Sequence, residues 1–141
     1  MKPPEKVKRE LVRQWLDKAE KDFGLAKHLV LENKPYFEAS CFHAQQAAEK
    51  YLKALLVWHQ VEFPKTHDLD EILDLVATID SPLAESLRDV ITLTPYGVEI
   101  RYPGDFPDTT PEDAKTAVEL AGKVRDAVVS TLKDYLGMGE P

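Results

Sequence analysis

Four polar residues recur every three or four positions between residues 43 and 53 and could form part of a binding site. They are His43, Gln46, Lys50 and Lys53. Residues at this spacing share one face of an α-helix. Two interpretations stay open: the line is the solvated face of that helix, or it is one wall of a ligand cleft.

A short polar connection, from Pro64 to Asp68, follows the same helix. His67 lies in it directly before a helix start, where an imidazole can either cap backbone amides or face a ligand phosphate. Asp68 followed by Glu71 resembles a capping box that opens the next helix. Of the histidines in this chain, His67 is therefore the strongest candidate for a site residue, with both roles open.

The histidines do not form a metal-binding pattern. His43, His59 and His67 are separated by sixteen and eight residues, and the chain holds one cysteine. Compact zinc sites instead use closely spaced pairs of Cys and His ligands. The sequence also lacks a glycine-rich phosphate loop and an HExxH pair. We therefore expect no metal and no cofactor.

A third candidate is the pair Arg101 and Tyr102, in the segment from Thr94 to Pro111. This segment holds four prolines and two glycines and shows no helical periodicity, which predicts a long loop. An arginine beside an aromatic residue suits phosphate pairing and base stacking. An arginine that ties such a loop to acidic neighbours is the alternative, and long loops within small domains are often functional.

Three long amphipathic helices must position these candidates, and apolar residues at steps of three and four predict them. We expect helices over about 9–32, over 36–60, and from 110–111 to about 136. The apolar line of the first consists of Val12, Leu16, Ala19, Phe23, Ala26 and Val30. The second line consists of Phe37, Cys41, Ala44, Ala48, Leu52 and Leu55. The last consists of Ala117, Leu120, Val124, Val128, Thr131 and Tyr135.

Two shorter helices are expected between the second and the last. The first follows Asp68, and its apolar face consists of Leu69, Ile72, Leu73 and Val76. The next is expected to start at Ser81, a hydroxyl cap before Pro82, and Pro95 and Gly97 leave its end undefined. Its apolar stripe consists of Leu83, Leu87, Val90 and Ile91.

No stretch alternates with a period of two, so the sequence predicts an all-α fold. We expect an up-and-down four-helix bundle with an additional short helix. The length of 141 residues fits a single domain, 1–141, with a core of about 10–136, a loop at about 94–111 and a frayed tail at 137–141. Trp15, Leu25 and Leu29 widen the apolar stripe of the first helix, which predicts a second buried surface and hence a homodimer.

The formal charge of −7 is unevenly distributed. Residues 1–34 carry +3 and residues 60–120 carry −10. An acidic chain is unsuited to tight, sequence-independent binding of duplex nucleic acid, which needs many cations facing phosphates. The single cysteine, Cys41, excludes an internal disulfide, and no run is apolar enough for a membrane span. We expect a soluble cytoplasmic protein that does not bind membranes.

Three motifs resemble a known family. They are FHAQQAAEKYLKALL from Phe42 to Leu56, PKTHDL from Pro64 to Leu69 and RYPG from Arg101 to Gly104. Together, in this order, they are similar to small stand-alone proteins of the HEPN family. The resemblance implies a helical bundle that dimerises, is paired with a minimal nucleotidyltransferase, and acts as the toxin half of a toxin–antitoxin pair. Many of these proteins are metal-independent ribonucleases.

The chain departs from the ribonuclease members at one position. Those members carry an Arg followed, after four to six residues, by a His, but here Phe106, Pro107 and Asp108 follow Arg101 at those distances. An aromatic ring or a proline cannot replace an imidazole in proton transfer. The resemblance thus implies a protein that binds nucleotide or RNA phosphates without the usual catalytic pair. The ligand-facing residues expected from it are Arg101, Tyr102, His67, Lys53 and His43.

Two alternatives stay open. The chain could be an endoribonuclease with an altered acid or base, for which His67 is the candidate. It could also be a purely structural helical partner of the nucleotidyltransferase.

Overall fold

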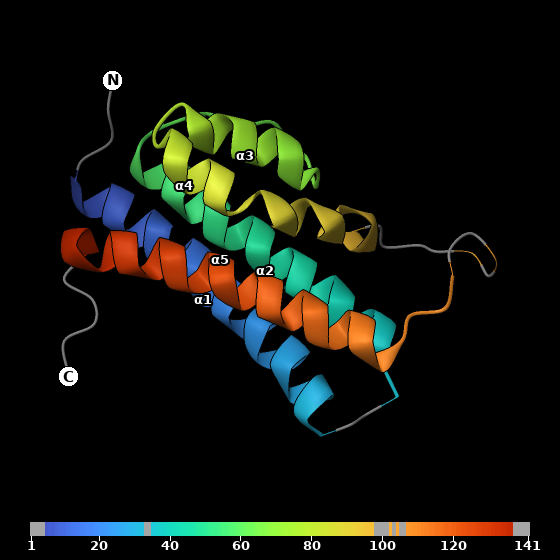
Figure 1. Cartoon of the computed structure of the whole chain (residues 1–141). Helices are drawn as coiled ribbons and strands as arrows, with labels where there is room; N and C mark the ends of the chain where they lie inside the picture. The colour runs from blue at the N-terminus through green and yellow to red at the C-terminus, as the bar shows by residue number, and fades with distance from the viewer. Residues whose placement is uncertain (1–4, 33–34, 98–101, 103, 105–106, 137–141) are drawn as a thin grey trace.

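The computed structural model describes residues 5–32, 35–97, 102, 104 and 107–136. It contains five α-helices and one 3₁₀ helix in these residues (Figure 1). The helices are α1 (Glu5–Leu31), α2 (Phe37–Trp58), α3 (Leu69–Ala77), α4 (Ser81–Ser86), the 3₁₀ helix η1 (Arg88–Gly97) and α5 (Pro111–Leu136). The predicted all-α fold is confirmed.

Helix α2 lies at the centre of the molecule. It contacts α1, α3, η1 and α5, and Figure 1 shows α1 and α5 running beside it, with α3 and α4 above. All of its predicted apolar line is buried except Phe37, which is half-buried, and Ala47, Tyr51 and Ala54 are buried on further sides. A helix that is buried on several sides is a core element rather than an amphipathic surface helix. Its side chains therefore decide what the interior can hold.

The helix expected from Ser81 consists of two short elements. Helix α4 ends at Ser86, and η1 continues the chain with Pro95 inside it. A 3₁₀ helix has three residues per turn, so the buried residues are Leu87, Val90 and Leu93, while the predicted Ile91 is exposed. The predicted α-helical phase fails here because the local helix period is 3.0 rather than 3.6.

The caps of the later helices differ from the prediction at one position. Asp80, not Ser81, caps α4, because its side chain accepts a hydrogen bond from Leu83 N at 3.1 Å. At α5 the prediction is correct: Thr110 Oγ1 accepts from Asp113 N at 3.1 Å, and Asp113 Oδ2 accepts from Thr110 N at 2.9 Å. This reciprocal pair satisfies two backbone donors that a helix start leaves unpaired.

The second half of α5 is rotated relative to the predicted apolar line. After Val128 the buried residues are Leu132 and Leu136, whereas Thr131 is half-buried and Tyr135 is 47% exposed. Steps of three and of four both fit a helix with 3.6 residues per turn, so the pattern alone left this phase undetermined.

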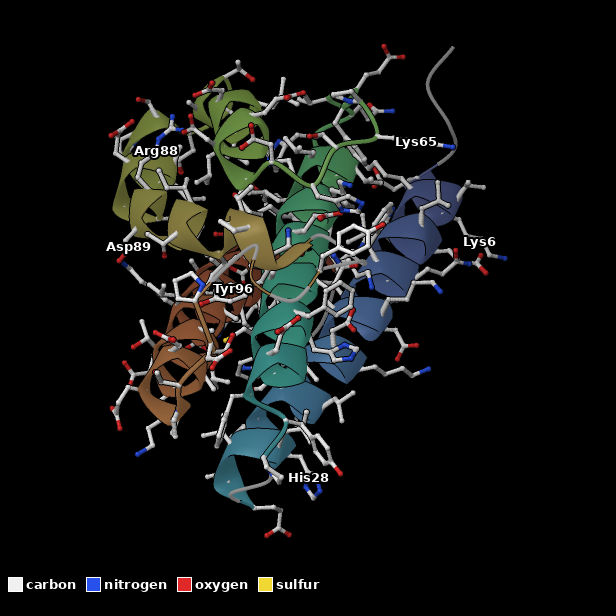
Figure 2. All side chains as sticks on the ribbon, turned by 90° about the vertical axis from the view of Figure 1, so that its right-hand side faces the viewer. Lys6, His28, Lys65, Arg88, Asp89 and Tyr96 are labelled. Atoms are coloured by element: carbon white, nitrogen blue, oxygen red, sulfur yellow. The ribbon has the colours of Figure 1, made fainter. Side chains whose placement is uncertain are left out.

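One arginine joins the short elements on the α3 side of the molecule. Arg88 forms ion pairs with Asp70 at 2.9 Å and Asp74 at 3.0 Å on α3, and with Glu85 at 3.3 Å on α4. Figure 2 shows Arg88 and Asp89 at one side of the molecule and Lys6 on α1 at the other. Among the described residues, no helix is long and apolar enough to span a membrane.

Candidate functional site

Three polar side chains lie buried in a row on α2. Gln45, Glu49 and Lys53 follow one another at a spacing of four, and they are only 0%, 3% and 6% exposed. Such groups are rarely buried unless their hydrogen bonds are satisfied. The row differs from the predicted polar line and shares one residue with it, Lys53.

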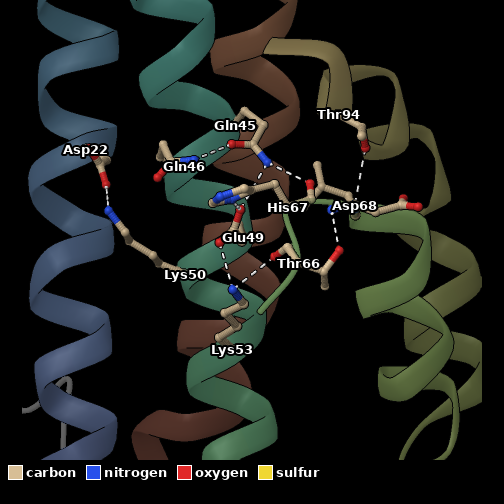
Figure 3. Close-up of polar contacts among 11 residues, drawn as sticks. Asp22, Gln45, Gln46, Glu49, Lys50, Lys53, Thr66, His67, Asp68 and Thr94 are labelled. Carbon is tan, nitrogen blue, oxygen red and sulfur yellow. Dashed lines mark hydrogen bonds and ion pairs between the residues drawn. The ribbon is translucent and has the colours of Figure 1, made fainter. Parts of the chain in front are cut away.

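The carboxylate of Glu49 is the centre of this row (Figure 3). Its Oε1 accepts a hydrogen bond from Gln45 Nε2 at 3.2 Å and lies 2.7 Å from His67 Nδ1. Its Oε2 accepts from Lys53 Nζ at 2.8 Å. Glu49 is thus bound to three side chains, one of which comes from the connection between α2 and α3.

The same residues hold the backbone of that connection. Gln45 Nε2 also donates to the carbonyl oxygen of His67 at 3.1 Å, and Lys53 Nζ donates to that of Thr66 at 3.1 Å. The rings of Trp15 and Phe63 flank the Lys53 ammonium, with centroids at 5.8 and 5.4 Å, a distance at which cation–π attraction operates. The connection is therefore fixed against α2 by buried polar contacts.

The imidazole of His67 faces outward from this connection. Its side chain is 62% exposed, whereas that of Glu49 is only 5% exposed. His67 does not cap α3, because Asp68 does so by accepting a hydrogen bond from Asp70 N at 3.0 Å. An exposed imidazole held through one ring nitrogen leaves the other nitrogen for a ligand.

His43 and Lys50 belong to a second polar cluster. His43 Nδ1 lies 2.9 Å from Asp22 Oδ1 of α1, and Lys50 Nζ pairs with Asp22 Oδ2. The side chains of His43 and Lys50 are 27% and 23% exposed. The predicted polar line is therefore not a freely solvated face, since its members join α2 to α1 or to the buried row. The structure does not bring His43 together with His67.

The end of η1 lies beside the buried row. Gly97, the last residue of η1, lies against the Gln45 amide: a Cβ added to Gly97 would stand 2.9 Å from Gln45 Cδ. Tyr102 is 68% exposed. Arg101 and Phe106 lie outside the described residues, so the ligand-facing role of Arg101 stays a prediction.

A separate concavity lies at the first turns of α1. Its volume is about 340 Å³, and Lys6, Arg9, Glu10 and Arg13 line it. Arg13 Nη2 donates to the carbonyl oxygen of Leu136 at the end of α5 at 2.7 Å. In the described part of the chain, no three His, Cys, Asp or Glu side chains are placed to hold a metal ion.

Gln45 and Glu49 were not predicted as site residues from the sequence. A signal was present, because Gln45, Glu49 and Lys53 repeat at a spacing of four, which places them along one side of a helix. The signal was ambiguous, since a Glu four residues before a Lys is also the usual surface pair on exposed helices.

Comparisons with known proteins agree with this fold. The sequence profile of the HEPN domain family matches residues 12–132. A Methanocaldococcus jannaschii protein named "Putative toxin MJ1304" is 27% identical over 139 residues, covering 88% of this chain and 90% of that relative. The crystal structure of ST0689, described as an archaeal HEPN homologue, has a TM-score of 0.67 and 26% identity. That of TT1696 from Thermus thermophilus has a TM-score of 0.70 and 30% identity. Each structural match covers 86% of this chain and 98% of the other.

Proposed function

Because this chain belongs to the HEPN domain family, we propose that it is the nucleotide- or RNA-phosphate-binding component of a two-gene, toxin–antitoxin-like system. Its partner in this proposal is a nucleotidyltransferase. The similarity to a relative named as a putative toxin supports the general class of function. The missing His after Arg101 favours binding without cleavage.

One observation carries the proposal: the exposed imidazole of His67 is held by the buried polar row of Gln45, Glu49 and Lys53. In this row, Lys53 and Gln45 bind the backbone carbonyl oxygens of Thr66 and His67. A rigid support of this kind presents a side chain to a ligand with little loss of conformational freedom on binding. Gly97 of η1 lies against Gln45 of the same row. Arg101, the predicted phosphate-binding residue, follows Gly97 by four positions in the sequence.

Binding can be tested by calorimetry with nucleotides and short single-stranded RNAs. The wild-type protein is expected to bind, and Arg101→Ala is expected to weaken binding by about tenfold or more, as removal of one charge-assisted phosphate contact costs about 1.5–3 kcal/mol. Lys133→Ala is the matched control, because it also removes one positive charge but lies in the last turn of α5. Absence of binding by the wild type would refute the ligand part of the proposal.

The partner is tested separately. The protein encoded beside this chain should co-purify with it from the native host, and the proposal requires that protein to be a nucleotidyltransferase. Stable co-purification with a nucleotidyltransferase, together with no binding of any nucleotide or RNA, would instead establish the purely structural alternative.

A second candidate function is RNA cleavage without a metal ion. The contact between His67 Nδ1 and the buried Glu49 carboxylate favours it, since a carboxylate that orients an imidazole is a common arrangement for a general base. Incubating the purified protein with total RNA in the presence of a chelator tests this function. Degradation that is lost in His67→Ala would support it, whereas intact RNA, or full activity of the variant, would exclude His67 as the base.

A further inference from the structure

The hydrogen-bond partners of Glu49 determine which atoms in the buried row carry protons. The Lys53 ammonium can only donate hydrogen bonds, so Glu49 Oε2 accepts from Lys53 Nζ. The Gln45 amide is oriented by the carbonyl oxygen of His67, which can only accept, so the NH₂ group of Gln45 faces both that oxygen and Glu49 Oε1. A protonated Glu49 could donate only to His67 Nδ1, whereas the Lys53 ammonium, 2.8 Å from Oε2, stabilises the ionised carboxylate. Glu49 is therefore an ionised carboxylate.

This assignment fixes the role of the His67 ring nitrogen that faces Glu49. An ionised carboxylate only accepts hydrogen bonds. At 2.7 Å from Glu49 Oε1, His67 Nδ1 must therefore be the donor and must carry a proton. In a neutral imidazole only one of the two nitrogens is protonated, so the second nitrogen, Nε2, is then an acceptor.

We propose that Glu49 is a positioning residue that holds His67 in the Nδ1–H tautomer, and that the exposed Nε2 accepts a hydrogen bond from a hydroxyl group of the ligand. Lys53, at 2.8 Å, already compensates the charge of Glu49, so a charged imidazole is not required as its counter-ion. A neutral imidazole acceptor suits a hydroxyl donor better than a phosphate oxygen, which itself only accepts.

The ligand class follows from combining this acceptor with the proposed function, on which this part of the inference rests. Among nucleotide and nucleic-acid ligands, the ribose 2′-hydroxyl is the group that distinguishes RNA from DNA. His67 is therefore assigned to the recognition of a ribose hydroxyl. The protein should prefer ribonucleotide ligands to the corresponding deoxyribonucleotides.

The tautomer can be measured directly by NMR. Long-range ¹H–¹⁵N correlation spectra of the imidazoles distinguish a protonated from an unprotonated ring nitrogen at a pH above the ordinary histidine range. The wild type should show His67 with a protonated Nδ1 and a bare Nε2. A spectrum with the proton on Nε2 would overturn the positioning role of Glu49, whatever any variant does.

A pair of variants separates positioning from a general effect on the fold. Glu49→Leu combined with Lys53→Met removes the acceptor while leaving no unpaired buried charge, and such apolar replacements of buried ion pairs are often tolerated. In it, His67 should populate both tautomers. Lys50→Met is the control, because it removes one ammonium group from α2 that pairs with Asp22 while keeping both Glu49 and Lys53, and it should keep the Nδ1–H tautomer. An unchanged tautomer in the double variant would contradict the inference.

Ligand preference is tested with a single-stranded RNA 12-mer and the DNA 12-mer of the same sequence, by fluorescence anisotropy in a chelating buffer. One neutral hydrogen bond changes affinity by about two- to tenfold, so the wild type should bind RNA more tightly by that factor. His67→Ala should bring the ratio close to one. Equal affinities in the wild type overturn the ribose assignment alone. No binding of either oligonucleotide overturns it together with the proposed function, while the NMR result still decides the role of Glu49.

Discussion

Tyr51 illustrates how single residues join the three long helices. Its phenol lies buried on α2 and donates a hydrogen bond to Glu20 Oε1 of α1 at 2.6 Å. Arg125 of α5 donates to the same oxygen at 2.7 Å. Burial raises the pKa of Tyr51, and the hydrogen bond to Glu20 and the negative charge of Glu20 raise it further. Deprotonation of this phenol is therefore incompatible with the packed state.

The raised pKa predicts a loss of stability at alkaline pH. The unfolded chain releases the phenol proton near pH 10.0, its ordinary pKa, while the folded chain retains it. The contribution of Tyr51 to stability is thus complete below pH 10 and declines above it, by up to about 1.4 kcal/mol per pH unit. Urea unfolding between pH 8 and 11 should show a shallower decline for Tyr51→Phe than for wild type. Tyr36→Phe, at an exposed position, should decline as the wild type does, and parallel curves for all three proteins would contradict the assignment.

Sequence patterns predicted His67, the exposed residue of the candidate site, but not Glu49, which binds it. His67 was predicted because it lies in a short polar turn beside a helix start, which is a local signal. Glu49 was not predicted, because its partner His67 lies eighteen residues away and only the packing of the connection onto α2 brings them together. A local pattern on an amphipathic helix cannot distinguish a buried carboxylate from a solvated one.

At the scale of elements, η1 is fastened at its end by two contacts. Thr94 Oγ1 accepts a hydrogen bond from Leu69 N at 3.2 Å, which joins η1 to the start of α3. Gly97 lies on the Gln45 amide, where a Cβ would stand 2.9–3.0 Å from three atoms of that side chain. The Gln45 amide cannot move freely, because it is bonded to Glu49 and to the carbonyl of His67. Gly97 is therefore required by close approach rather than by an unusual backbone angle.

We expect Gly97→Ala to destabilise the protein by about 1–3 kcal/mol, the usual cost of forcing an atom into a packed site. Hydrogen exchange at the Leu69 amide should also accelerate, because Leu69 bonds to Thr94 of η1. Gly24→Ala is the control. It lies inside α1 with no heavy atom within 4 Å of the added Cβ, so it should stabilise by about 0.5–1 kcal/mol. Equal effects of the two substitutions in chemical denaturation would show that Gln45 gives way easily.

The long helices were predictable because each buries a continuous apolar face. The lines of α1 and α2 and the stripe from Leu69 to Val76 follow the period of 3.6 and are buried or half-buried as expected. The prediction failed where the identity of the buried residues depended on packing against other helices or on the local helix type. The continuation of α5 through Leu132 rather than Thr131 is set by packing on the other helices, and the tighter period of η1 is not encoded by apolar spacing alone.

For the whole molecule, the outer face of α1 carries apolar side chains that the described fold leaves exposed. Val7, Leu11 and Leu25 are 43%, 42% and 42% exposed. Residues that are four and eighteen positions apart lie on nearly the same side of a helix with 3.6 residues per turn. These three side chains therefore form one stripe along α1, which suits the homodimer predicted from the sequence.

The dimer is tested by multi-angle light scattering at micromolar concentration. The wild type should have twice the chain mass of 16.0 kDa, and Val7→Lys with Leu11→Lys should give a monomer, since two opposed copies would place like charges in contact. Leu31→Lys is the control, because Leu31 is 72% exposed but lies outside this stripe. A monomeric wild type refutes the dimer, and a dimeric double variant places the interface elsewhere.

The first turns of α1 lie against the last turn of α5, and this contact bears on how the chain could be reconnected. Arg9 and Arg13 donate to the carbonyl oxygens of Tyr135 and Leu136, and Figure 1 shows the two ends on the same side of the molecule. A short linker could therefore join Leu136 to Glu5 in a circular permutant, with new ends opened in the turn at residues 78–80, where Thr78 and Asp80 are exposed. Such a chain would be synthesised in a different helix order but would pack the same core, and its refolding rate would measure how far the native order of helices matters for folding.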